Sequence, residues 1–104
     1  MTNKIYYNAL LDFYSPLLTE KQQAICDEYF RNDNTLQEIA DEENISRAAV
    51  GDMIKRCKDE LDEYESKLNL YASYKKRLQI YDRIKSFKNK DINVLIDECL
   101  EIEE

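Results

Sequence analysis

The sequence has very few residues that break secondary structure or ligate metals. Its 104 residues include one glycine, one proline and no histidine. Glycine and proline supply most tight turns, so their scarcity excludes a strand-rich fold and predicts helices joined by short polar loops. Without histidine, the cysteines Cys26, Cys57 and Cys99, which lack C-x-x-C spacing, are too few to form a zinc site. They are interpreted as small buried hydrophobic residues in a reducing compartment.

Long hydrophobic runs and catalytic motifs are also missing. No segment approaches the roughly 20 apolar residues of a membrane span, and the N-terminus lacks a signal-peptide core. There is no glycine-rich phosphate loop and no histidine for a catalytic triad. The carboxylates between Asp59 and Glu65 point in several directions on a helix and indicate a solvated surface. The sequence therefore predicts a cytoplasmic, non-enzymatic protein with no catalytic residues, cofactor, metal, small-molecule substrate or membrane insertion.

What is present is the pattern of a helix-turn-helix between Thr35 and Leu61. Thr35 and Glu38 have capping-box spacing, which predicts a helix start. Ser46 is a good N-cap for a second helix, and Ile45 before it can pack on Val50. One buried face of that second helix is predicted from steps of four and three residues: Val50, Ile54, Cys57 and Leu61.

The opposite side of this second helix is the position of a DNA-reading surface. Its candidate contact residues are Arg47, Lys55, Arg56 and Lys58. Arginine and lysine can bond guanine in the major groove, which favours duplex DNA as a partner. Against this, Asp52 would lie among phosphates, and Ala48 and Gly51 offer no hydrogen bonds to bases. A scaffold that does not touch nucleic acid also fits the pattern, because fold does not fix function.

Several segments together resemble the YlxM family of small bacterial proteins. They are LLDFY (10–14), LTEKQ (18–22), EIA (38–40), NIS (44–46), RxAV (47–50), GDMIKR (51–56) and DEYESKL (62–68). The resemblance implies an all-α fold with a three-helix core similar to region 4 of sigma factors, without a wing. It further implies a regulatory protein associated with the signal recognition particle pathway, whose partner would be the particle's protein or RNA component. Gly51 stands where relatives often carry an aromatic residue.

The remaining periodicity predicts a first helix over 4–14, a second over 19–31 and an extended C-terminal helical arm. The domain boundaries are set at 1–66 for the helix-turn-helix domain with its N-terminal helix and 67–104 for the arm. A bend is expected between Asn69 and Ser73, and Asp91 is expected to cap the last helix. The apolar face of the arm predicts a homodimer, with a back-folded monomer as the alternative.

Charge is unevenly distributed along the acidic chain. Residues 67–90 carry eight basic side chains and one acidic one, whereas residues 91–104 carry six acidic ones and no basic one. The candidate phosphate-binding residues of the arm are Lys75, Lys76, Arg77, Arg83, Lys85 and Lys88. They can bind RNA or DNA, pair with the acidic tail, or be simply solvated.

Overall fold

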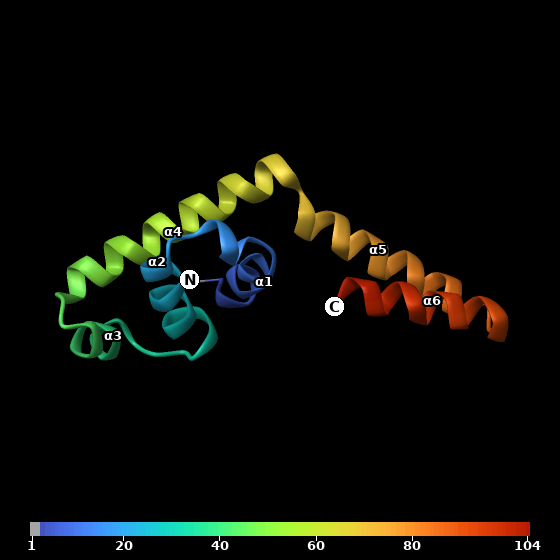
Figure 1. Ribbon diagram of the computed structural model, residues 1–104, viewed down its shortest axis with the longest axis horizontal. Coiled ribbons are helices and arrows are strands. Elements are labelled where there is room, and N and C mark those ends of the chain that lie inside the picture. The colour runs from blue at the N-terminus through green and yellow to red at the C-terminus, as the bar shows by residue number, and fades with distance from the viewer. Residues whose placement is uncertain (1–2) are drawn as a thin grey trace. The chain divides into compact units, whose positions relative to one another are not determined.

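The computed structural model describes residues 3–104, and its contacts form two compact units, Met1–Leu68 and Asn69–Glu104 (Figure 1). Throughout the described residues the regular elements are helices, with no strand, so the predicted all-α fold is confirmed. The first unit contains α1 (Lys4–Tyr14), the 3₁₀ turn η1 (Ser15–Leu17), α2 (Glu20–Cys26), the π-helical turn η2 (Asp27–Arg31), α3 (Leu36–Glu43) and α4 (Arg47–Leu68). The second contains α5 (Leu70–Lys85) and α6 (Lys90–Glu103).

The predicted helix-turn-helix is formed by α3, the turn at 44–46 and α4. Thr35 and Glu38 form the expected capping box, each accepting a hydrogen bond from the other's backbone N–H. Asn44 ends α3 in the left-handed conformation, at a φ of 58°. The Ser46 hydroxyl accepts from the Ala49 N–H at 3.0 Å and so caps α4. These side chains satisfy backbone groups that a helix end leaves unpaired.

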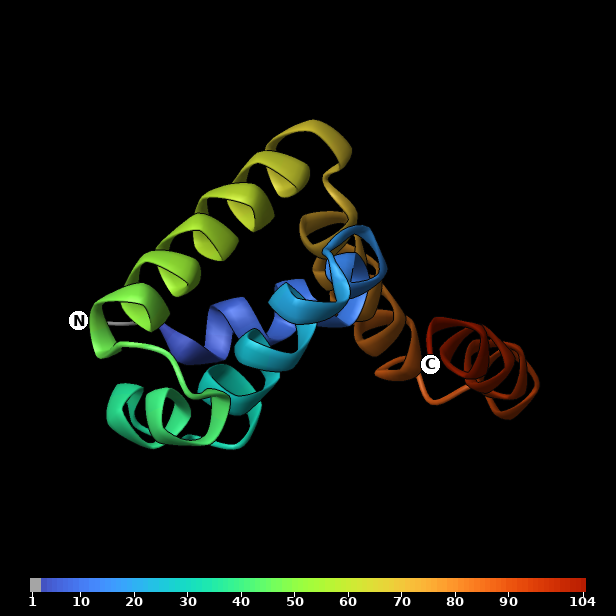
Figure 2. The ribbon, with the colours of Figure 1, turned by 60° about the vertical axis from the view of Figure 1, so that its left-hand side comes forward.

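The core of the first unit lies where α1, α2 and α3 pack against α4 (Figure 2). The buried face predicted for α4 is confirmed, since Val50, Ile54, Cys57 and Leu61 are all buried. The other helices contribute Leu10, Leu11, Tyr14, Ile25, Cys26, Phe30, Ile39 and Ala40 to this core. The sequence spacing predicts that Ala24 shares the apolar stripe of its helix with Ile25, Tyr29 and Phe30, but Ala24 is exposed.

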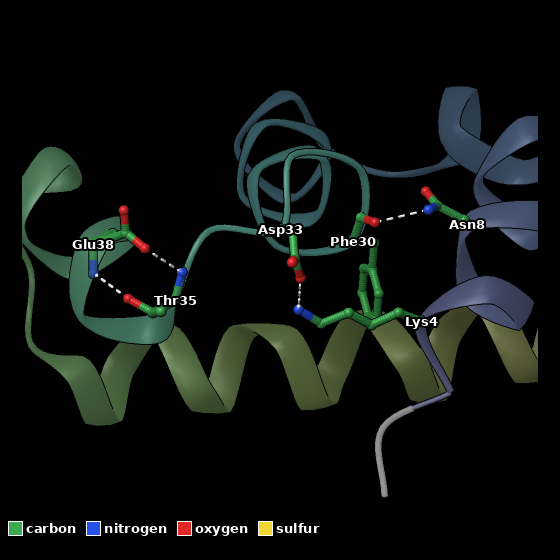
Figure 3. A network of polar contacts seen from close by, with 6 residues as sticks. All are labelled: Lys4, Asn8, Phe30, Asp33, Thr35 and Glu38. Carbon is green, nitrogen blue, oxygen red and sulfur yellow. Dashed lines mark hydrogen bonds and ion pairs between the residues drawn. The ribbon is translucent and has the colours of Figure 1, made fainter.

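The segment between α2 and α3 is tied to α1 by polar contacts (Figure 3). Asn8 donates from Nδ2 to the Phe30 carbonyl at 2.7 Å. Lys4 pairs with Asp33 at 2.6 Å, and the Lys4 ammonium lowers the pKa of that exposed carboxyl. The single helix predicted over 19–31 is divided in the structure into α2 and the wider π-helical turn η2.

The second unit is a helical hairpin in which α5 packs on α6. The predicted bend is confirmed and is confined to Asn69, which adopts a φ of 55°. The predicted cap at Asp91 is wrong: the Asn89 side chain accepts from the Ile92 N–H at 3.1 Å, so α6 begins at Lys90. Asn and Asp are both suitable N-cap residues, so the position of the turn between α5 and α6 decides whether Asn89 or Asp91 caps α6.

Candidate nucleic-acid interface

The first turns of α4 carry the residues proposed from the sequence as a reading surface. Arg47 and Lys55 are exposed and lie eight residues apart, which places them on one side of the helix. Between them lie Ala48, Gly51 and Asp52, which provide neither a positive charge nor a long donor. This side of α4 thus presents two separated cations with a carboxylate nearby.

The other two candidates on α4 do not extend that surface. Arg56 is exposed, but it follows Lys55 directly and therefore points about 100° away around the helix. Lys58 is partly buried, with its Nζ 5.6 Å from the ring centroid of Tyr7 on α1. Arg47 and Lys55 therefore share one side of α4 without being close to each other, whereas Arg56 points away from Lys55 and Lys58 lies beside Tyr7.

Gly51 faces open space in the middle of this surface. A Cβ atom built on Gly51 would meet no heavy atom within 4 Å. Glycine costs a helix interior about 1 kcal/mol relative to alanine, because more backbone freedom is lost on folding. We expect Gly51→Ala to raise the free energy of unfolding by roughly 0.5–1 kcal/mol. Urea denaturation monitored by circular dichroism measures this, and an unchanged or lower midpoint would contradict it.

Two of the six basic residues proposed on the arm are engaged by acidic residues of α6. The Arg77 Nε lies 2.5 Å from Glu103 Oε2, and the Lys85 Nζ lies 2.5 Å from Asp97 Oδ1. The Glu103 side chain is only 15% exposed, so this pair is partly shielded from water. Arg77 and Lys85 therefore link α5 to α6. For these two residues, the predicted alternative of pairing with the acidic tail is the one observed.

The other four basic residues, Lys75, Lys76, Arg83 and Lys88, are exposed and form no ion pair with any residue from 3 to 104. Lys76 and Arg83 are seven residues apart and so align along α5, about 10 Å from one another. Gln79 is exposed between them and was not proposed from the sequence, although its spacing of three and four residues could have identified it. We call Lys75, Lys76, Gln79 and Arg83 the outer face of α5, because all four side chains are exposed.

Metal binding and membrane insertion find no support in the part of the chain that the structure describes. Nowhere in residues 3–104 do three histidine, cysteine, aspartate or glutamate side chains gather in a way that could hold a metal ion. Over the same residues, each helix is too short or too polar to span a membrane. The exposed basic side chains of α4 and α5 are the candidate features for nucleic-acid binding.

Comparison with known proteins gives a consistent assignment. Residues 1–99 match the model of a family, UPF0122, described as "Putative helix-turn-helix protein, YlxM / p13 like". UPF0122 proteins of Streptococcus pneumoniae strains Hungary19A-6 and CGSP14 are each 46% identical to the chain over 90 residues. Each match covers 86% of this chain and 80% of the relative.

Proposed function

The chain belongs to this YlxM / p13 like helix-turn-helix family, and on that basis we propose that it is a non-enzymatic accessory protein of the signal recognition particle pathway. Its proposed partner is the RNA component of the particle, bound through the outer face of α5 and Lys88. The pathway follows from the resemblance to YlxM proteins, and the choice of surface follows from the distribution of charge.

The proposal rests on the position of the lysine and arginine side chains that form no ion pair in the described residues. Nucleic-acid affinity comes largely from lysine and arginine near phosphates, and acidic surroundings oppose it. The segment 1–66 has 7 basic and 15 acidic residues, so a phosphate backbone approaching α4 meets net repulsion. Lys75, Lys76, Arg83 and Lys88 lie instead in the basic segment 67–90 and keep their charges available. This favours α5 over α4 as the phosphate-binding element.

Sequence-specific binding to duplex DNA is the second candidate. It is favoured by the helix-turn-helix itself and by Arg47 and Lys55, which are exposed on one side of α4. In this function the start of α4 would enter the major groove, where each bidentate contact to guanine contributes about 1–3 kcal/mol of discrimination.

Two triple variants that each remove three positive charges test the proposal. We expect Lys75→Ala/Lys76→Ala/Lys88→Ala to weaken binding to bacterial signal recognition particle RNA by at least about tenfold, since three phosphate contacts are lost. The slope of log affinity against log salt concentration should fall by about 2 for the same reason. Fluorescence anisotropy with labelled RNA, at several salt concentrations, measures both quantities.

The matched control is Arg47→Ala/Lys55→Ala/Arg56→Ala, which changes the net charge equally but acts on α4. It should retain most of the RNA affinity. If the control loses binding and the α5 variant does not, the proposed surface is wrong. Selection of duplex DNA from a random pool covers the second candidate: one enriched motif that is lost in the α4 variant would establish DNA recognition instead.

A further inference from the structure

The α5–α6 hairpin exposes large apolar side chains that it cannot cover by itself. Across residues 69–104, all of them described, Ile96 alone among the side chains is buried. The large exposed hydrophobic residues are Leu70 at 43%, Ile80 at 50%, Phe87 at 81%, Ile92 at 43%, Val94 at 60%, Leu95 at 59% and Ile102 at 83%. A unit as small as Asn69–Glu104, below about 40 residues, rarely buries enough apolar surface to be stable alone.

Most of these side chains lie on one flank of the hairpin. Successive residues of a helix are about 100° apart, and α5 and α6 run antiparallel. The contacts Arg77–Glu103 and Lys85–Asp97 show which residues of the two helices are level, that is, at the same height along the hairpin. With these as reference, Ile80 and Ile84 of α5 fall on the same side as Ile92, Leu95 and Ile102 of α6. We call this set the apolar flank; Val94 lies outside it, on the far edge of α6.

The level residues form a ladder across the flank. Ile84 is level with Leu95, and Ile80 is level with Ile102. The opposite flank is polar, since it carries the Lys85–Asp97 ion pair together with the exposed Lys75 and Asp82. A hairpin with one apolar and one polar flank resembles one half of a four-helix bundle, in which the apolar flanks of two hairpins pack together.

We propose that the apolar flank is covered by the same flank of a second copy of this chain, which gives a two-fold dimer in which α5 of one protomer packs over α6 of its partner. Self-association closes the surface without a different partner, because a two-fold axis presents each flank with its own complement. This inference does not depend on RNA binding.

Charge selects this arrangement over one in which the two α5 helices face each other. Lys76 and Arg83 are exposed at the outer edge of α5, whereas Asp91 and Glu98 are exposed at the outer edge of α6. Packing α5 over α5 would bring the two basic edges together, and packing α5 over α6 brings opposite charges together. With the two-fold axis along the helices, Arg83 is level with Glu98 of the partner subunit. In the dimer Arg83 is thus engaged at the interface, and Lys75, Lys76 and Lys88 remain for phosphate binding.

Sedimentation velocity of the full chain tests the dimer. At tens of micromolar we expect the mass of two 12.4 kDa chains. Leu95→Asp should raise the dissociation constant at least tenfold, because it places a charge inside the interface. Val94→Asp is the matched control: Val94 is adjacent and equally exposed but outside the flank, and this variant should dimerise almost normally. A wild-type monomer, or equal losses in both variants, would overturn the proposal.

A charge exchange tests the arrangement. Arg83→Glu and Glu98→Arg should each weaken the dimer about fivefold, and the double variant should recover most of the wild-type affinity. If Arg83→Glu strengthens association, or if the double variant is weaker than either single one, α5 does not pack over the partner's α6. Since Leu95 is outside the proposed RNA surface, RNA binding by Leu95→Asp separates a failure of this inference from a failure of the proposed function.

Discussion

Leu61→Ala is expected to lower the free energy of unfolding by about 2–5 kcal/mol. Leu61 is 0% exposed on α4, the helix against which α1 and α2 both pack. Removing its side chain loses the transfer free energy of the missing carbons and leaves a cavity between helices that can close only in part. Urea unfolding, followed by circular dichroism at several protein concentrations, measures the change and separates it from any effect of association.

The matched control for this substitution is Leu68→Ala. Leu68 is the last residue of the same helix and is 51% exposed, so the same atoms are removed from a site that is already largely in water. We expect a loss of less than about 1 kcal/mol. Similar losses for the two variants would mean that the buried side of α4 is not the core of the first unit.

The three cysteines are expected to differ greatly in reactivity. Cys26 and Cys57 are both 0% exposed in the core. Interaction with the Cys57 thiol, together with burial, raises the pKa of the Cys26 thiol and so disfavours the reactive thiolate. Reaction at either residue therefore requires the core to open, and we expect it to be at least about 10³-fold slower than for an accessible thiol.

Titration with a chromogenic disulfide at pH 8 counts the thiols directly. In the folded protein Cys99, which is only partly buried, should react first, and Cys26 and Cys57 should follow much more slowly. In concentrated urea all three should react at one fast rate. Cys99→Ser is the control, and it should abolish the fast phase of the folded protein. A single rate for all three residues in the folded state would contradict the buried positions of Cys26 and Cys57.

The features that could be predicted from sequence are those coded by nearby residues. The capping box at Thr35 needs only Glu38 three residues later, and the buried face of α4 needs only its own spacing. The features that were missed depend on other elements. Ala24 fits an apolar stripe by spacing but is exposed, and η2 forms where the Phe30 carbonyl accepts from Asn8 of α1.

The candidate site shows the same limit. The six basic residues of the arm have the same charge in the sequence, and nothing local distinguishes Arg77 from Lys76. They differ because Arg77 reaches Glu103, a residue 26 positions away on another helix. Sequence reasoning could therefore find the basic segment but not which of its charges are already neutralised.

The π-helical turn η2 also affects how homologous chains can be aligned. A π turn accommodates one residue more than an α turn, so a relative lacking one residue between Asp27 and Arg31 could close the turn as regular α-helix. The residues before and after it would keep their directions. A deletion inside α4 would instead rotate every following side chain by about 100° and remove Leu61 from the core. A one-residue difference in length would thus be accommodated more readily at η2 than in α4.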